Sequence, residues 1–221
     1  MPRYGKKGNL TMVDNKKTAR KAGVWYLAFI LLGAFSIMFV DDVLTVTGNA
    51  TVTLENFRAN TALFIFGTIA YTAGYVCFIF VVNNLSRLFR TTGKQLTLFM
   101  RITVYIGVVV ALACKAAQII AFTVSDIEFL TFYETGTAAA VIFWGLWLLP
   151  LGLLILKSNL IPKIVGYLLL GACAANLADF VIHFILSSTP EVALTVCYIL
   201  GMLGEFGLVL WLLIRGVRKN K

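Results

Sequence analysis

Four ionisable residues lie deep within long apolar stretches of this sequence, and they are its strongest candidates for chemistry. They are Lys115, Asp179, His183 and Glu205. An ionisable group at the centre of a bilayer costs about 2.5–3.5 kcal/mol even on the most lenient insertion scale. Such groups are typically kept where they bind ions, relay protons or pair with one another.

Helical spacing groups most of these residues into one polar set. Counted at 1.5 Å per residue from the basic ends of their stretches, Lys115 lies about 24 Å deep and Asp179 about 22 Å deep. The two charges are opposite and nearly level, so we expect them to form an ion pair. Asn176 and His183 share the helix face of Asp179, because steps of three and four residues return to one face. Gln118 and His183 should extend the pair toward the outer water.

Two further contacts are expected. Glu205 lies about 15 Å from the basic end of its stretch. Tyr71 lies at a similar height, so we expect a hydrogen bond between the two side chains. At the outer rim, Arg58 and Glu134 open two of the stretches, and we expect them to form an exposed ion pair that contributes little to stability.

Three interpretations of the buried polar set remain open. In the first, a polar cavity binds a small solute or relays protons, as in a transporter-like or sensory membrane protein. In the second, the charges only fix the helix register of a structural or accessory subunit. In the third, a membrane protein partner or a second copy of the chain completes the contacts of the buried groups.

Several chemistries are not favoured, and no cofactor or metal is expected. Haem ligation by two imidazoles needs two histidines, whereas the chain has one. A catalytic zinc site needs about three protein ligands, and Asp179, His183 and Glu205 lie at depths too different to share one ion. The sequence has no GxSxG elbow and no P-loop, so an enzyme is the less favoured class. The cysteines lie inside apolar stretches without CxxC spacing and should pack as small apolar residues: Cys77, Cys114, Cys173 and Cys197.

These residues must be positioned by membrane-spanning helices. Of the 221 residues, 60% are hydrophobic and only 13% are charged, about half the charged share of a soluble domain. Six apolar stretches can each cross a hydrocarbon core of about 30 Å, which takes about 20 helical residues. They lack the two-residue alternation of barrel strands. The sequence therefore predicts an all-α polytopic membrane protein with six transmembrane helices, over residues 22–40, 60–82, 99–123, 131–156, 164–187 and 192–214.

The basic residues fall almost entirely on one side of these stretches. All but two of the 19 Lys and Arg residues precede the first stretch, follow the sixth, or lie in the second–third and fourth–fifth links. By the positive-inside rule, both termini are cytoplasmic. Anchoring to anionic lipid headgroups explains the net charge of +9 without a nucleic-acid partner. The predicted organisation is a basic tail (1–21), a six-helix domain (22–215) and a second basic tail (216–221), with Met12 as an alternative start to Met1.

Two local features are also predicted. Apolar and basic residues interleave between residues 83 and 98, which suits a short helix lying at the membrane interface. Pro150 lies inside the fourth stretch and lacks a backbone donor, so we expect the helix to bend near it.

Three segments carry a resemblance to a known family. The entry into the first stretch at 18–26 (TARKAGVWY), the turn at 160–166 (LIPKIVG), and the closing Gly204-Glu205 with 210–216 (LWLLIRG) resemble domain-of-unknown-function family 4386. The similarity covers residues 16–217, and the residues before Lys16 depart from the family's shorter start. The resemblance implies a bacterial integral protein of the cytoplasmic membrane with six spans. It implies no activity.

Overall fold

The described residues form helices joined by short links. The computed structural model describes residues 4–181 and 191–218, with side chains described for 14–181, 199 and 201–218. Its helices are α1 (Tyr4–Ser36), the π-helix η1 (Ile37–Asp41), α2 (Asp42–Leu44), α3 (Ala50–Ala59), α4 (Thr61–Phe89), α5 (Lys94–Val124), α6 (Ile127–Leu146), α7 (Leu148–Ser158), α8 (Lys163–Val181) and α9 (Glu191–Ile214).

Five of the helical segments are long and apolar enough to cross a membrane, and this indicates a membrane protein. They are Asp14–Leu44, Thr61–Phe89, Lys94–Val124, Ile127–Ser158 and Lys163–Val181. In the part of the chain with described side chains, α9 adds a shorter apolar helix, Gly201–Ile214. The all-helical class is therefore confirmed, whereas a sixth span stays a prediction.

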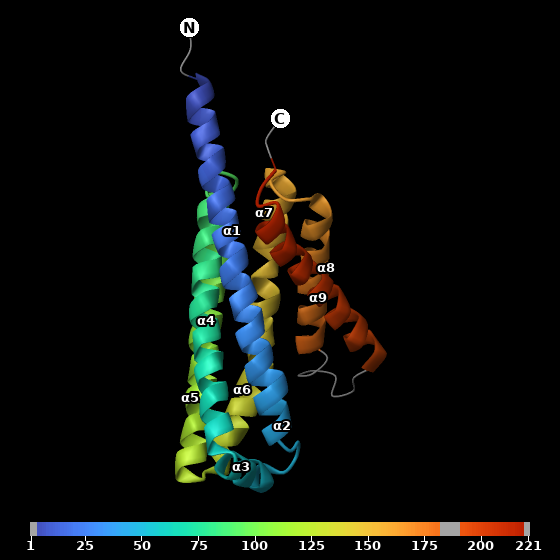
Figure 1. Ribbon diagram of the computed structural model, residues 1–221. Coiled ribbons are helices and arrows are strands. Elements are labelled where there is room, and N and C mark those ends of the chain that lie inside the picture. The colour runs from blue at the N-terminus through green and yellow to red at the C-terminus, as the bar shows by residue number, and fades with distance from the viewer. Residues whose placement is uncertain (1–3, 182–190, 219–221) are drawn as a thin grey trace.

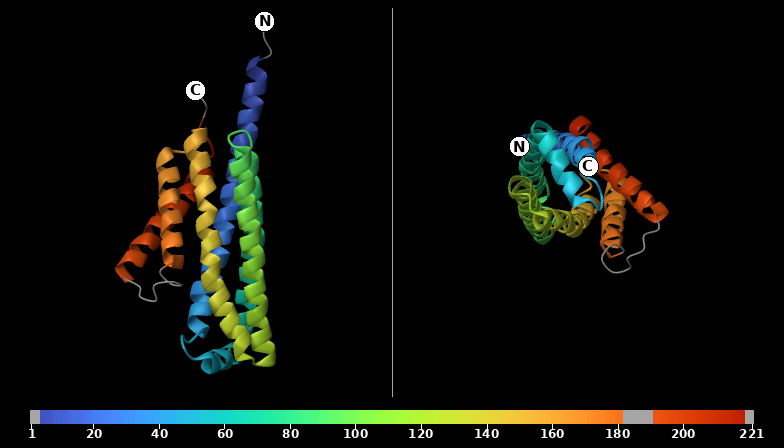
Figure 2. Two further views of the ribbon diagram at one scale, coloured as in Figure 1. Left: turned by 180° about the vertical axis from the view of Figure 1, so that it is seen from behind. Right: turned by 90° about the horizontal axis from the view of Figure 1, so that it is seen from below.

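The long helices run up and down between two ends of the bundle (Figure 1). One end, which we call the terminal end, holds the beginning of α1, the end of α9, and the α4–α5 and α7–α8 links; Figure 2 shows the same grouping from behind. The other, the α3 end, holds α3 and the α5–α6 link. The helix α8 packs against α6, α7 and α9, and α9 also packs against α1.

Apolar packing divides between the two ends. The larger core centres on aromatic rings in the terminal half, where Phe78 meets Trp147 edge-on at 5.0 Å and stacks on Phe29 at 4.5 Å. Such ring contacts add about 0.5–1.5 kcal/mol each beyond area burial. A smaller core at the α3 end includes Phe57 of α3 and Phe64 of α4, whose rings lie 4.7 Å apart.

The link between the second and third predicted stretches differs from its sequence prediction. Between residues 83 and 98 there is no separate interfacial helix: α4 continues to Phe89, a tight turn follows, and α5 begins at Lys94. The apolar residues of this segment, such as Leu85 and Leu88, are buried in the core, so their spacing belonged to a long helix. A short surface helix occurs instead at the opposite end, where the Asn49 side chain caps α3 by accepting a hydrogen bond from the Val52 amide.

The fourth stretch is interrupted near its proline, as the sequence predicts. Helix α6 ends at Leu146 and α7 begins at Leu148, so the break falls at Trp147, three residues before Pro150. Because proline has no N–H group, the turn before it loses a helical hydrogen bond.

A glycine allows α1 and α4 to approach closely at the α3 end. A Cβ atom added to Gly67 of α4 would lie 2.6 Å from Cγ1 of Val40 in η1. Val40 is almost fully buried, and its β-branched side chain has little rotamer freedom in a helix. The contact at Gly67 therefore fixes the segment that carries Asp41.

We predict that Gly67→Ala destabilises the protein by about 1–3 kcal/mol, because the added methyl group overpacks against Val40. The measurement is unfolding of the purified protein in detergent micelles. Gly33→Ala on α1 is the matched control, since a Cβ atom there meets nothing within 4 Å. Equal stability of the two variants would contradict the close contact.

Candidate functional site

A buried ion pair between Lys115 and Asp41 forms the centre of the candidate site. Lys115 Nζ lies 3.1 Å from Asp41 Oδ2 and 3.3 Å from Oδ1. The Lys115 side chain is 3% exposed and that of Asp41 is 11% exposed. The pair joins the end of the first long helix to α5.

Neighbouring polar groups complete the hydrogen bonding of the pair. The Gln118 amide accepts from Lys115 Nζ at 2.7 Å through Oε1 and donates to Asp41 Oδ1 at 3.2 Å through Nε2. The Tyr133 hydroxyl donates to Asp41 Oδ2 at 3.1 Å. Both carboxylate oxygens therefore have two donors each, which is what a buried charge needs to persist.

Two aromatic rings add to the binding of the ammonium group. Lys115 Nζ lies 4.4 Å from the ring centroid of Tyr71 on α4 and 5.1 Å from that of Tyr133 on α6. Cations within about 6 Å of a ring face are attracted by its quadrupole, more strongly when water is excluded. The ammonium is thus held by one carboxylate, one amide and two rings.

The placement of Asp41 depends on the π-helical turn η1. This turn follows α1 directly and ends at Asp41. Its wider winding, a feature often found at functional sites, leaves Asp41 buried and the adjacent Asp42 exposed. Leu44, three residues on, is buried in the smaller core. The chain then turns into α3, whose Asn56 side chain donates to the Leu44 carbonyl oxygen at 3.1 Å.

A second polar contact lies in the terminal half of the molecule. The Tyr26 hydroxyl of α1 donates to Glu205 Oε2 of α9 at 2.5 Å. Tyr26 is fully buried among aromatic residues and meets Trp147 edge-on at 5.9 Å. Tyr26 precedes Asp41 by 15 residues, which places the two polar contacts roughly 22 Å apart along the same helix.

The structure brings together only part of the predicted polar set. Lys115, Gln118 and Tyr71 meet at the ion pair. The expected pairing of Lys115 with Asp179 is wrong, because Lys115 pairs with Asp41. Asp179 lies on α8, whose main packing partners are α6, α7 and α9. Equal depth did not mean proximity, since depth says nothing about which helices are neighbours.

The other predictions have mixed outcomes. Glu205 bonds to Tyr26 and not to Tyr71, because α9 packs against α1. Asn176 donates to the carbonyl oxygen of Ala172 in its own helix. His183 lies outside the described residues.

At the rim, the expected pair of Arg58 and Glu134 is not formed. Within the described ranges the ion pair found is that of Lys115, and both rim side chains are exposed. Arg58 lies in the last turn of α3, one helix earlier than expected, and α3 runs across the end of the bundle.

Sequence reasoning missed three residues of these contacts: Asp41, Tyr133 and Tyr26. The first predicted stretch ends at residue 40, which places Asp41 outside it. The available signal was the apolar Val43-Leu44 that follows, which indicates that the helix continues past Asp41. Tyr133 and Tyr26 gave no signal that separates them from other aromatic residues in apolar helices.

This arrangement allows another positive charge to take the place of Lys115 as the partner of the Asp41 carboxylate. A proton or small cation at Asp41 would neutralise the charge that pairs with Lys115, and the ammonium group would keep Gln118 and the two tyrosine rings as partners. The described residues contain no group of three or more His, Cys, Asp and Glu side chains that could hold a metal ion. The groups that meet at this site are a carboxylate, an amine, an amide and phenols.

Comparisons with known proteins give a family but no activity. A family model described as domain of unknown function (DUF4386) matches residues 21–216. No curated protein and no solved structure matches the chain.

The new pairing predicts which second substitution rescues the loss of Lys115. Lys115→Ala should destabilise the protein by about 3–5 kcal/mol, because it leaves a buried carboxylate unpaired. Adding Asp41→Ala should recover part of this loss, with a coupling of about 1–3 kcal/mol. Unfolding in detergent micelles measures the double-mutant cycle. Asp179→Ala is the control, and its effect should add to that of Lys115→Ala within about 0.5 kcal/mol. Rescue by Asp179→Ala instead of Asp41→Ala would support a Lys115–Asp179 pair and contradict the pairing with Asp41.

The second contact makes a separate prediction. Tyr26→Phe should cost about 1–3 kcal/mol in the free energy of unfolding, because it removes the hydrogen bond that the fully buried Tyr26 hydroxyl donates to the half-buried Glu205 carboxylate. Tyr167→Phe serves as the control, since Tyr167 is 60% exposed on α8. A Tyr26→Phe protein as stable as this control would show that the hydrogen bond does not contribute.

Proposed function

The chain belongs to the family of domain of unknown function DUF4386, and we propose that it is a multi-pass membrane protein whose Asp41–Lys115 centre binds a proton or small cation. Such binding would serve a transporter-like or sensory component of a membrane. Its main support is the burial of a complete Asp–Lys pair within helices that are apolar enough to cross a membrane.

We also propose that the chain spans the membrane six times, with both termini in the cytoplasm. Of the described basic residues, those at the beginning of α1, at the end of α9 and around the α4–α5 and α7–α8 links lie at the terminal end of the bundle. The positive-inside rule assigns such an end to the cytoplasmic face of the cytoplasmic membrane. The Asp41–Lys115 centre then lies in the outer half, because Lys115 is about 14 Å by helical rise from the end of α5 at Val124.

Energetics favour a role beyond stability for this centre. Replacing a buried ion pair by apolar residues of similar volume is often neutral or stabilising by 1–4 kcal/mol in proteins. A bundle that needed only packing would gain little from keeping both charges. The π-helical turn supports the same conclusion, since it places Asp41 in the interior at the cost of regular α-helical bonding.

The proposed event is an exchange at the Asp41 carboxylate. When a proton binds Asp41, the ion pair is lost, and Lys115 keeps the Gln118 carbonyl oxygen and the two tyrosine rings as partners. Asp41 is part of η1, which packs on α4 through Val40 and Gly67. A change at the carboxylate would therefore act on the contact between the first helix and α4.

The alternative is a structural or accessory subunit, and one observation favours it. Both oxygens of Asp41 and the nitrogen of Lys115 are already engaged by described neighbours, so the pair needs no ligand to satisfy it. On this alternative the network only fixes helix register, and a partner protein or a second copy of the chain carries the activity.

Infrared difference spectra recorded over a series of pH values and of cation concentrations would test binding at this centre in protein reconstituted into liposomes. We expect a carboxylate signal that responds in the wild type and in Asp42→Asn, and whose response is lost in Asp41→Asn. Asp42 is a matched control because it is adjacent but exposed. A pH-sensitive dye inside the liposomes reports whether protonation is coupled to flux.

Two results would favour the structural alternative. One is an Asp41 carboxylate that keeps its signal at every pH at which the protein is folded. The other is an Asp41→Asn/Lys115→Met protein that folds and retains any flux of the wild type.

A further inference from the structure

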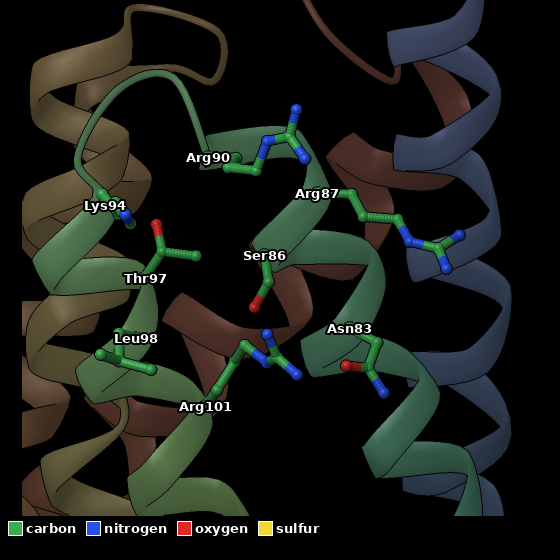
Figure 3. Close-up of a pocket in the computed structure, with 8 residues that line it drawn as sticks. All are labelled: Asn83, Ser86, Arg87, Arg90, Lys94, Thr97, Leu98 and Arg101. Carbon is green, nitrogen blue, oxygen red and sulfur yellow. The ribbon is translucent and has the colours of Figure 1, made fainter.

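A second site lies at the terminal end of the bundle, between the end of α4 and the beginning of α5. It is a pocket of about 720 Å³, large enough for a small polar ligand or a lipid headgroup. Figure 3 shows its lining: Asn83, Ser86, Arg87, Arg90, Lys94, Thr97, Leu98 and Arg101. Four of these residues are cationic and none is acidic. The pocket is separate from the Asp41–Lys115 centre, which lies toward the other end of α5.

The cationic residues alone do not establish a ligand site. Arg87 and Arg90 end α4, where positive charge is favourable beside the helix C-terminus. Arg87, Arg90 and Lys94 are exposed and can remain hydrated. These three exposed residues would attract an anion, but an ordinary basic surface would do the same.

Two buried donors without partners distinguish this pocket from such a surface. Ser86 is only 7% exposed, and its Oγ has no hydrogen-bond partner. Nε of Arg101 is also buried and without a partner. Figure 3 shows the two side chains pointing toward each other across the pocket. A buried donor left unsatisfied costs about 1–3 kcal/mol, more when it is charged, so an acceptor between them would be strongly favoured.

The orientation of Arg101 is set by its neighbours. Its guanidinium carbon lies 5.6 Å from the ring centroid of Tyr105, and Nη2 lies 3.4 Å from the hydroxyl oxygen of the same residue. That hydroxyl donates to Asn83 Oδ1 at 2.7 Å. The guanidinium is thus fixed in the pocket with its Nε unoccupied, in the planar fork geometry that suits phosphate oxygens.

The beginning of α5 lies beside the same pocket. Gly93 precedes this helix without a side-chain cap, and its first turn contains no acidic residue. The first amides of a helix lack intrahelical partners and favour bound anions, phosphate above all. Lys94 and Thr97, both in the pocket lining, place this helix end against the pocket.

We propose that this pocket binds a phosphate group, held by Arg101 and Ser86 and attracted by Arg87, Arg90 and Lys94. Two sources share this chemistry: the headgroup of an anionic phospholipid and a soluble phosphate. An apolar stripe favours the lipid, because exposed Leu98, Ile102 and Ile106 follow one another at four-residue steps down α5 from the pocket. An acyl chain can lie along this stripe while the phosphate occupies the pocket.

Native mass spectrometry of the full chain, titrated with phosphatidic acid or phosphatidylcholine, tests the proposal. We expect saturable retention of one phosphatidic acid, with affinity lowered roughly tenfold or more in Arg101→Gln/Ser86→Ala. Lys157→Gln/Lys163→Gln is the control, since both lysines are exposed at the same end outside the pocket lining. The control removes two charges and the pocket variant removes one, so general attraction would weaken the control more.

Inorganic phosphate added at constant ionic strength separates the two sources. Displacement of the lipid assigns the pocket to soluble phosphate, and retention of the lipid assigns it to a phospholipid headgroup. An equal loss of affinity in the pocket and control variants would overturn the proposal. So would the absence of saturable binding of both phosphatidic acid and inorganic phosphate.

Two milder variants guard against misfolding. Ser86→Ala removes a hydroxyl that has no partner in the structure, and Arg101→Lys keeps the charge while removing Nε. Each should fold, as checked by helix content and melting temperature, and each should weaken phosphatidic acid binding. Wild-type affinity in both folded variants would also overturn the proposal.

Discussion

Burial of the Asp41–Lys115 pair is the constraint on which much of this structure depends. A charged pair inside an apolar bundle is tolerated only when its remaining donors and acceptors are satisfied. Gln118 and Tyr133 meet this need from α5 and α6, and the ring of Tyr71 contributes from α4. Four helical segments must therefore keep their relative positions for one pair of charges to persist. The close contact at Gly67 and the π-helical turn help to place Asp41 within this set.

The first long helix is the common element of both polar contacts. It supplies Asp41 near the α3 end and Tyr26 in the terminal half, and it packs against both α4 and α9. These partners lie far apart in the sequence, since Glu205 follows Tyr26 by 179 positions and Lys115 follows Asp41 by 74. The first long helix thus connects α5, in the middle of the chain, with α9 near its end.

Local patterns in the sequence were enough to predict the helical class and most of the long helices, because apolar length and charge placement are local signals. They also identified Lys115, Gln118 and Tyr71 as members of a polar site. The partners were not predictable in this way. Asp179 and Asp41 are both carboxylates near the right depth, and only the packing of α8 against α6, α7 and α9 decides between them. A π-helical turn also changes which residues face inward, and a fixed helical period cannot anticipate it. The pocket between α4 and α5 was likewise hidden, since its arginines were explained as topology signals.

Tyr26 and Asp41 lie on one helical segment, since η1 follows α1 directly, and this couples the positions of the two side chains. The helix is stiff along its axis, so a displacement at one contact is carried over the roughly 22 Å to the other. A shift of this helix along its axis by one residue would move the Tyr26 hydroxyl and the Asp41 carboxylate by about 1.5 Å, which is more than a hydrogen bond tolerates. A displacement of this helix along its axis would therefore strain both contacts at once.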